Sequence, residues 1–383
     1  MALSRSQKRA LFRSSLFLFA ATIIVYILWP VSSTQESVPR EPKEFERPLD
    51  AIRNETLGVQ AVFAINLPSR TDKQDALVLG SSVSNFRVEF IDGISPDEID
   101  PKTYPYNWNH NHKAKEYAAR RAHVDGMLRI VHERLATAII MEDDADWDVT
   151  IKTQLQSFAV AVRALQGIGL TTATNSPYGD HWDILWLGHC GIECRTDRAS
   201  FLTPNDPTIL PAHRFLPYWR DPPPIDRPEH ARLTCFASDG VCTFVYAVSY
   251  RGAQKILSAL SVNPSEIADK IDIGAQFDVS LGRMCKIGYI RCFAPYPSLT
   301  GNYQPAGPMA KSSDIHGRDG IREKTTSLGV MYSTMLNINR ILHGDRIVHS
   351  HWDDAEMPNV NPDRISVMGG KVQMPGKLSV RVV

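Results

Sequence analysis

An apolar run that ends in a cluster of carboxylates constrains this chain more than any other feature. Residues 138–141 are apolar, and they are followed by Glu142, Asp143, Asp144 and Asp146. The apolar run predicts a buried strand. Four acidic side chains at its end would repel one another and would be costly to bury unpaired. A divalent cation removes both costs, because carboxylate oxygens suit Mn²⁺ or Mg²⁺ and such an ion can be shared with substrate phosphates.

Alternation along a strand would bring three of these carboxylates to one side. Alternate side chains of an extended chain share a face, so we predict that Glu142, Asp144 and Asp146 converge. The simpler interpretation is a solvent-exposed acidic turn after a strand. An EF-hand loop is excluded, because Val149 stands at its required glycine and Leu155 at its bidentate glutamate.

The N-terminal region predicts a membrane anchor. Residues 14–33 form an uncharged span of 20 residues, which is long enough to cross a thin bilayer. The basic residues nearest to it lie in the tail 1–13, so this tail should be cytosolic and the bulk of the chain luminal. A cleaved signal peptide is the alternative, but the apolar core is long for one and no A-x-A site follows it. We therefore expect a single-pass type II protein of the Golgi or endoplasmic reticulum membrane.

Composition and cysteine usage fit a folded luminal domain. The 42 basic residues balance the 42 acidic ones, so no global field favours nucleic acid as a partner. In the lumen the six cysteines are free to form disulfides, and six cysteines permit 15 pairings. The close pairs 190/194, 235/242 and 285/292 favour local loops. A zinc site from His189, Cys190 and Cys194 is the alternative, although no second Cys/His pair stands at a finger-like spacing.

Changes in composition divide the luminal part into segments. Residues 34–57 are polar, which is typical of a stem, and their sequon Asn54-Glu55-Thr56 predicts a glycoprotein. Residues 58–305 form the predicted catalytic domain. It is interrupted at 204–228 by an insert with eight prolines, a density that no regular element tolerates. Residues 306–383 form a C-terminal extension with one predicted helix, near 328–342.

Strands and helices alternate along the predicted catalytic domain. Apolar runs predict strands at residues 59–67, 86–93, 138–148, 181–188, 242–249 and 289–298. Helical spacing and start signals predict helices after residue 70, at 116–135, at 154–165, from 252 onward and at 277–285. This alternation predicts an α/β architecture with a mostly parallel central sheet.

Five segments carry a resemblance to a known family, in the family's order. They are AINLPSRTDK at 64–73, IIMEDDADW at 139–147, DILWLG at 183–188, FVYAVSYRGAQKIL at 244–257, and FDVSL at 277–281 with FAPYPSL at 293–299. Together they resemble glycosyltransferase family 25, which includes lipopolysaccharide and procollagen galactosyltransferases. The chain departs from the family at Lys73, where arginine is usual, and at Ala122, which precedes His123 in place of a serine. We expect a single-pass membrane member of fungal type.

The resemblance implies a fold, a reaction and a metal. The fold would be GT-A-like, a Rossmann-related architecture that binds a nucleotide sugar. The reaction would be an inverting transfer of a hexose, with galactose favoured, from a UDP-hexose to a glycan or glycoprotein acceptor. A Mn²⁺ or Mg²⁺ ion would stabilise the charge that develops on the leaving diphosphate. The matching positions make Asp144 the first candidate ligand of this ion, with Glu142 and Asp146 for the rest.

The resemblance also implies residues that bind the donor. Asn66 and Arg70, at the end of the first predicted strand, would face the nucleotide. Asp143 would contact the ribose or the sugar of the donor. The ends of strands and the turns after them are where open α/β sheets bind ligands. The simpler interpretations are a surface charge for Arg70 and an ordinary turn residue for Asn66.

Inversion needs one general base to take the proton of the acceptor hydroxyl. Asp278 is the candidate, because it matches the family's late aspartate, and Asp239 and Asp272 are its rivals. The alternative for Asp278 is a carboxylate at a helix N-terminus, where the helix dipole favours it. We interpret His123 as a packed, hydrogen-bonded residue.

Two functions of other classes stay open at this point. One is a non-catalytic, glycosyltransferase-like protein that binds glycans or serves as a scaffold, and the complete acidic cluster argues against it. The other is a metal-dependent hydrolase, in which water is the acceptor.

Overall fold

The computed structural model describes residues 48–105, 107–109, 111–210, 222–350 and 358–375. These described residues all belong to one compact unit. The predicted tail and anchor, 1–33, and most of the predicted stem lie outside the described residues. Among the described residues, no helix combines the length and the apolar character that a membrane crossing requires.

The N-terminal half alternates strands with helices, as the sequence predicts. Its elements are η1 (Pro48–Arg53), β1 (Ala61–Asn66), α2 (Thr71–Val83), β2 (Glu89–Asp92), η2 (Pro96–Glu98), η3 (Pro101–Thr103), α3 (Ala114–Glu133), β3 (Thr137–Glu142), β4 (Ala145–Trp147) and α4 (Ile151–Leu165). Strands β1 and β3 are buried along nearly their whole length, which explains why each is a continuous apolar run in the sequence.

The C-terminal half begins with strands and ends with short, mixed elements. They are β5 (Ile184–Gly188), β6 (Ile192–Cys194), β7 (Ser200–Thr203), β8 (Arg232–Gly240), β9 (Val245–Ser249), α5 (Tyr250–Leu257), η5 (Ser258–Val262), α6 (Ser265–Ala268), α7 (Phe277–Lys286), β10 (Cys292–Tyr296), β11 (Thr300–Gln304), β12 (Gly307–Pro308), η6 (Met309–Ser312), β13 (Ile321–Arg322), β14 (Thr326–Leu328), α8 (Thr334–Leu342), η7 (Pro362–Arg364) and β15 (Lys371–Gln373). The predicted helices at α5, α7 and α8 are confirmed.

The central sheet is mixed, so the prediction of a mostly parallel sheet is wrong. Its strand order is β15-β7-β8-β10-β5-β9-β3-β1-β2, with β6 paired to β8. The pairs β1–β2, β1–β3 and β5–β10 are parallel, but β9 runs antiparallel to both β3 and β5. A parallel neighbour needs a crossover, usually through a helix. Between β5 and β9 the described residues form strands and no helix, so the chain returns in the opposite direction.

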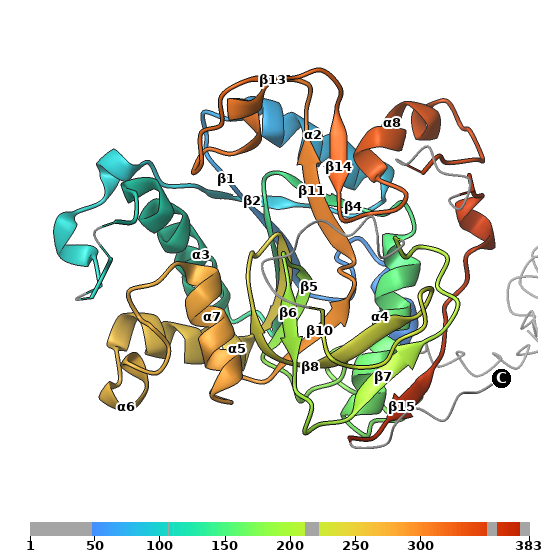
Figure 1. The fold of residues 1–383 in the computed structure, drawn as a ribbon, viewed down its shortest axis with the longest axis horizontal. Helices are drawn as coiled ribbons and strands as arrows, with labels where there is room; N and C mark the ends of the chain where they lie inside the picture. Colours follow the sequence, from blue (N-terminus) through green and yellow to red (C-terminus); the bar gives the residue numbers. More distant parts are fainter. Residues whose placement is uncertain (1–47, 106, 110, 211–221, 351–357, 376–383) are drawn as a thin grey trace, which may run out of the picture. The chain divides into compact units, whose positions relative to one another are not determined.

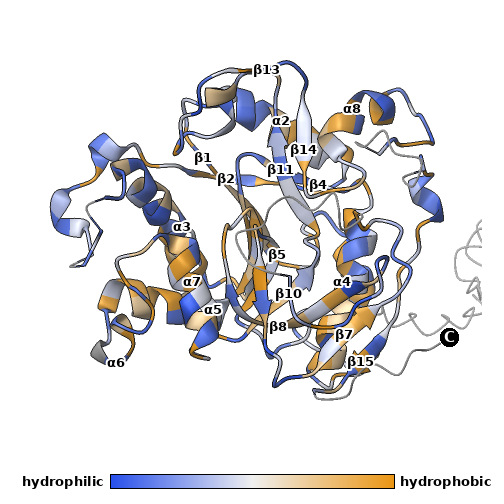
Figure 2. Cartoon of the chain, in the orientation of Figure 1, coloured by the Kyte–Doolittle hydropathy of each residue, from blue (hydrophilic) through white to orange (hydrophobic). Residues whose placement is uncertain are grey.

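Each face of the sheet buries its own hydrophobic cluster, and each cluster is covered by its own helices (Figure 1). Phe63, Ile140 and Tyr246 point to the face covered by α3, α5 and α7. Their neighbours along the strands point the other way, to the face covered by α2, α4 and α8. This alternation follows the two-residue period of a strand. Figure 2 shows the hydrophobic colour concentrated in the strands at the middle of the sheet.

Three disulfides cross-link the described residues, and two of them differ from the predicted local loops. The bonds are Cys190–Cys242, Cys194–Cys235 and Cys285–Cys292. Only the last is the predicted neighbour pair. The first two tie the segment containing β6 to β8 and its following turn, because β6 lies antiparallel to β8. The alternative zinc site with His189 is excluded, since both of its cysteines are cross-linked.

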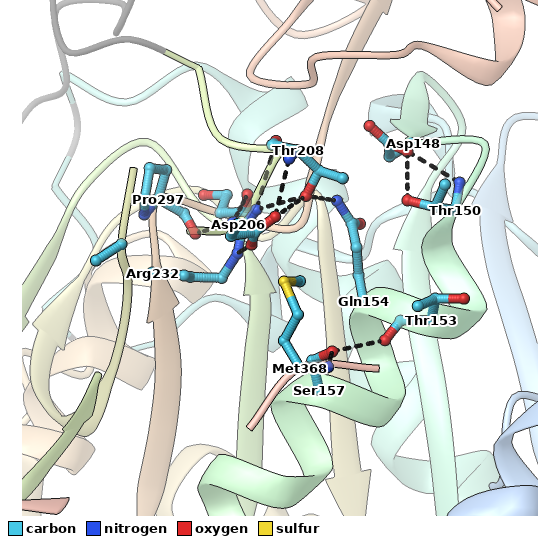
Figure 3. Close-up of polar contacts among 12 residues, drawn as sticks. Asp148, Thr150, Thr153, Gln154, Ser157, Asp206, Thr208, Arg232, Pro297 and Met368 are labelled. Atoms are coloured by element: carbon cyan, nitrogen blue, oxygen red, sulfur yellow. Dashed lines mark hydrogen bonds and ion pairs between the residues drawn. The ribbon is translucent and has the colours of Figure 1, made fainter. Parts of the chain in front are cut away.

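A buried ion pair anchors the two ends of the proline-rich insert (Figure 3). Arg232 at the start of β8 donates from Nε to Asp206 Oδ2 at 2.6 Å and from Nη1 to the Pro297 carbonyl at 2.8 Å. Thr208 donates from Oγ1 to Asp206 Oδ1 at 2.6 Å and accepts from Gln154 Nε2 at 2.7 Å. Asp206 and Arg232 are only 2% and 5% exposed. The described ends of the insert are thus joined to β8, α4 and the residue after β10 by a buried polar network.

We predict that Arg232→Met lowers the free energy of unfolding by about 3–5 kcal/mol, because it leaves the Asp206 charge buried without its partner. Chemical denaturation of both proteins measures this difference. The double variant Arg232→Met/Asp206→Leu should recover part of the loss, since it no longer buries a lone charge. A single variant as stable as the wild type would contradict the assigned role of this pair.

Candidate functional site

The candidate site lies at the edge of the sheet where β1 and β3 end. Both strands run in the same direction, so Asn66 at the end of β1 and Glu142 at the end of β3 belong to the same edge. The chain then turns at Asp143 and Asp144 before β4, which pairs antiparallel with β11. The predicted strand 138–148 is therefore two strands with a turn between them. This turn breaks the alternation on which the predicted convergence of Glu142, Asp144 and Asp146 rested.

Asp146 faces the C-terminal part of the chain. Its Oδ2 accepts from Ser327 Oγ at 2.6 Å and from Ser333 Oγ, and its Oδ1 accepts from the Met335 backbone N–H at 3.3 Å. Asp146 is fully buried, and burial raises the pKa of its carboxyl group. No group of three metal-ligating side chains converges in the described part of the chain. The structure thus gives Asp146 bonding partners that are separate from Glu142 and Asp144.

Asp144 carries an oxygen atom that has no hydrogen-bond partner in the described part of the chain. Its Oδ1 is buried, and no hydrogen-bond donor among the described residues reaches it. Burial raises the pKa of Asp144 to about 8 against the lowering effect of Lys73, and the carboxylates of Glu142 and Asp143 raise it further. A buried acceptor beside other carboxylates fits a hard cation, which would supply the missing partner. The residues present therefore fit a divalent ion at Asp144.

Two cations at the start of helix α2 are linked to this acidic turn, Lys73 directly and Arg70 through Asp314. Lys73 Nζ lies 2.6 Å from Asp143 Oδ1 and 3.0 Å from Asp314 Oδ2. Arg70 Nη1 lies 2.5 Å from Asp314 Oδ2, and its Nη2 lies 2.9 Å from Asp72 Oδ2. Burial alone would lower the pKa of Lys73, but the surrounding carboxylates outweigh this effect and raise it. Lys73 therefore stands close to Asp144, and Arg70 shares the partner Asp314 with it.

A second polar group surrounds Glu142 on the side of helices α3 and α7. Thr243 Oγ1 donates to Glu142 Oε1 at 3.0 Å, and His123 Nε2 lies 3.7 Å from the same oxygen. His123 Nδ1 lies 2.9 Å from the Tyr246 hydroxyl, and its ring stacks on Phe277 at 4.8 Å. The interpretation of His123 as a packed, hydrogen-bonded residue is confirmed. Glu142 is thus oriented by neighbours on α3 and on the turn before β9.

Asp278 lies in the first turn of α7 and is held by two backbone donors. Its Oδ2 accepts from Cys242 N at 2.8 Å, and its Oδ1 accepts from Val279 N at 2.9 Å. Burial raises the pKa of Asp278, and the negative charge of Glu142 raises it further, against the effect of the two N–H donors. A raised pKa favours proton acceptance, while the bond to Val279 is the one expected of a helix N-terminal carboxylate. The geometry is compatible with both predicted roles.

The rivals of Asp278 have other surroundings. Asp239 on β8 is 2% exposed and forms an ion pair with Arg283 at 3.2 Å. Asp272 is exposed and has a left-handed backbone, with φ of 51°. Asp278, in contrast, is close enough to the acidic turn for the charge of Glu142 to raise its pKa. We therefore keep Asp278 as the candidate base.

Asn66 adds a second buried acceptor at this edge. Its Nδ2 donates to the Leu67 carbonyl at 2.8 Å, while its Oδ1 has no donor among the described residues. The side chain is only 3% exposed. Buried amide oxygens are normally hydrogen-bonded, so an unpaired one at the end of β1 fits the predicted contact with a ligand.

Sequence reasoning missed several residues of this group. Lys73 stood out only as a departure from the family pattern, although its spacing from Arg70 places both cations at one helix end. Thr243 carries no signal of its own in the sequence. Asp314 lies beyond the segment that resembles the family, and it joins the group only through the path of the chain after β11.

Comparisons with known proteins do not assign this chain to a family. No protein-family model matches it, and no curated protein matches it. Among solved structures it is similar to one described as mannose-1-phosphate geranyltransferase from Thermus thermophilus. That match has 10% identity and covers 61% of this chain and 72% of the other, with a TM-score of 0.25. This value is too low to support an argument, so the fold is described from its own strands: an α/β protein with a mixed central sheet.

Substitution of Asp144 should affect metal binding, whereas substitution of Asp146 should affect stability. We predict that Asp144→Ala loses Mn²⁺ binding while the fold survives, because removing one clustered carboxylate also relieves repulsion. Asp146→Ala should destabilise the fold by about 1–3 kcal/mol for each buried donor that loses its partner. Titration calorimetry with Mn²⁺ and thermal unfolding measure the two effects. Wild-type Mn²⁺ affinity in Asp144→Ala, or an Asp146→Ala protein that loses the ion at unchanged stability, would contradict this division.

Proposed function

We propose that this chain is a metal-dependent, inverting glycosyltransferase with a GT-A-like fold. It transfers a hexose, with galactose favoured, from a UDP-hexose to a glycan or glycoprotein acceptor. The observation that carries the proposal is an Asp144 oxygen without a partner among the described residues. It lies at the edge where β1 and β3 end, close to Lys73, which shares Asp314 with Arg70. Carboxylates for a divalent ion and fixed cations for phosphate groups are the two requirements of a nucleoside diphosphate.

The proposed donor site uses the residues of this edge. Asp144 would hold the Mn²⁺ or Mg²⁺ ion, with Glu142 as a further candidate ligand. Such ions are commonly bound through one or two carboxylates together with substrate phosphates, so a cage of three protein ligands is not required. We leave Asp146 out of the ligand set, because its oxygens accept hydrogen bonds from the C-terminal segments.

The remaining donor contacts come from three side chains. Asn66 would offer its unpaired oxygen to a hydroxyl or amide of the nucleotide, and Arg70 would bind a phosphate. Asp143 would contact the ribose or the sugar of the donor. The bound ion would stabilise the negative charge of the departing diphosphate.

Asp278 is the proposed general base for the acceptor hydroxyl. Two backbone N–H groups fix its carboxylate, and burial raises its pKa, which favours proton acceptance. The negative charge of Glu142 raises this pKa further, so the acidic turn influences how readily Asp278 takes a proton.

We predict that Asp278→Asn retains donor and Mn²⁺ binding but lowers kcat by about 10²–10⁴-fold. The amide has nearly the same size but cannot accept a proton at neutral pH, and the loss should appear in kcat because proton removal belongs to the transition state. The amide also keeps only one of the two accepting oxygens, so rates should be normalised to the protein that binds donor. A normalised kcat above about half of the wild-type value would remove Asp278 from the mechanism.

The activity itself is tested with the purified full-length chain in detergent against a panel of nucleotide sugars, with Mn²⁺ and with chelator. Transfer that requires the ion supports the proposal. Donor hydrolysis without transfer would favour a metal-dependent hydrolase. Absence of donor binding under both conditions would favour a non-catalytic glycan-binding or scaffold protein.

The three disulfides indicate an extracellular or secretory-pathway location. We propose the finer assignment of a type II protein in the Golgi or endoplasmic reticulum membrane, supported by the uncharged span 14–33 and the basic tail before it. Asn54 of the sequon is exposed, as a glycosylated residue must be. Protease treatment of sealed microsomes should leave the C-terminal part intact until detergent is added. Digestion before detergent would contradict this topology.

A further inference from the structure

One carboxylate from the C-terminal extension occupies the cation pair of the candidate site. We call residues 305–322 the flap. Asp314 of the flap accepts from Arg70 Nη1 through both oxygens, at 2.6 and 2.5 Å, and lies 3.0 Å from Lys73 Nζ. Arg70 Nη2 also donates to the Lys311 carbonyl of the flap at 2.8 Å. One oxygen of the carboxylate thus bridges two cations, and the second shares one of them, in the arrangement that phosphate oxygens adopt on such pairs.

The positions of Arg70 and Lys73 favour a bound anion. Arg70 is the N-cap residue of α2 and Lys73 lies in the first turn of this helix, where the helix dipole is already positive. Their side chains are only 15% and 11% exposed, so water screens them poorly. Asp72 partly neutralises Arg70, and Asp143 partly neutralises Lys73. Asp314 is the only group in the described residues that is ion-paired with both cations.

The flap is attached to the rest of the protein by polar contacts. None of the residues 305–322 belongs to the hydrophobic clusters of the described chain, and Ile321 is 76% exposed. The flap is closed on itself by the pairing of β12 with β13 and by Arg322, which donates to Ser312 Oγ at 2.6 Å. Near its tip, His316 lies 3.9 Å from Glu116 on α3. A segment that contributes no side chain to the hydrophobic clusters opens at lower free energy than the core around it.

We propose that Arg70 and Lys73 form an anion site for the phosphates of a nucleoside diphosphate, and that Asp314 is the internal anion that fills this site until the ligand displaces it. The inference rests on the proposed function for the identity of the ligand, but the anion site itself does not. Opening moves the flap as a unit about its two ends, since its own hairpin contacts are internal. The ligand replaces the carboxylate of Asp314 on the same two cations, so no positive charge is left unpaired in either state.

This arrangement makes the flap a competitive and removable cover. A closed state that is about tenfold more populated than the open state raises the apparent Kd of the ligand about tenfold. It also excludes small anions whose binding is weaker than the contacts that Asp314 loses when the flap opens. Asp144 would hold the divalent ion of the proposed function, and a diphosphate has more oxygens than a single phosphate to share between such an ion and the two cations. We therefore expect selectivity for a diphosphate.

Binding of inorganic pyrophosphate to the full-length chain in detergent tests this inference. Titration calorimetry with Mn²⁺ should give about tenfold tighter binding to Asp314→Asn than to the wild type. Asp314→Glu, which keeps the carboxylate, should stay close to the wild type. Asp319→Asn is the matched control, since Asp319 is an exposed carboxylate of the same flap, and it should bind as the wild type does.

Limited trypsin digestion supplies the second measurement. Arg318 is exposed near the tip of the flap, and pyrophosphate should accelerate cleavage there by opening the flap. Equal or weaker pyrophosphate binding by Asp314→Asn would overturn the inference, as would cleavage that pyrophosphate slows. Tighter binding together with no sugar transfer from any donor would keep the flap and remove the proposed function. Transfer activity with unchanged Asp314→Asn binding would remove the flap alone.

Discussion

A single buried carboxylate fixes the geometry on which the candidate site depends. Asp146 accepts hydrogen bonds from Ser327 on β14, from Ser333 at the start of α8 and from the backbone of Met335. These contacts join segments almost two hundred residues apart in the sequence to the strand that follows the acidic turn. Because β4 is held in this way on one side and paired with β11 on the other, the turn at Asp143 and Asp144 has a defined path. Glu142 and the two acidic residues of the turn are thereby presented at the edge of the sheet.

Each cation at this edge of the sheet is shared between two carboxylates. Lys73 is shared between Asp143 and Asp314, and Arg70 between Asp72 and Asp314. The carboxyl groups of Asp143 and Asp144 have raised pKa values because burial opposes their ionisation, and each added negative charge makes the next one harder to form. A cation that enters this site would lower the pKa values of these carboxyl groups. Strongly shifted pKa values of this kind are typical of places where a charged ligand binds.

The elements of the first half could be predicted well from the sequence, and the sheet less well. Strands β1 and β3 are buried on both faces, so their apolar runs were unambiguous. The direction of β9 could not be predicted, because nothing local encodes the absence of a crossover helix between β5 and β9. The short strands β6 and β7 lack an apolar run of useful length. Pairing of Cys190 with Cys242 and of Cys194 with Cys235 depends on the β6–β8 ladder, which proximity along the chain does not reveal. The acidic residues were predicted as a group, but the turn that separates Asp146 from them depends on β11, far along the chain.

The Cys190–Cys242 disulfide affects the surroundings of the Asp278 carboxylate. Cys242, the residue whose backbone N–H holds the Asp278 carboxylate at 2.8 Å, is also a half-cystine with a left-handed φ of 62°. A left-handed conformation is unfavourable for a residue with a side chain. The cross-link to Cys190 therefore helps to hold the backbone N–H of Cys242 in place. A chain that is folded but still reduced would lack this restraint. The surroundings of the Asp278 carboxylate therefore depend on oxidation of the Cys190–Cys242 pair.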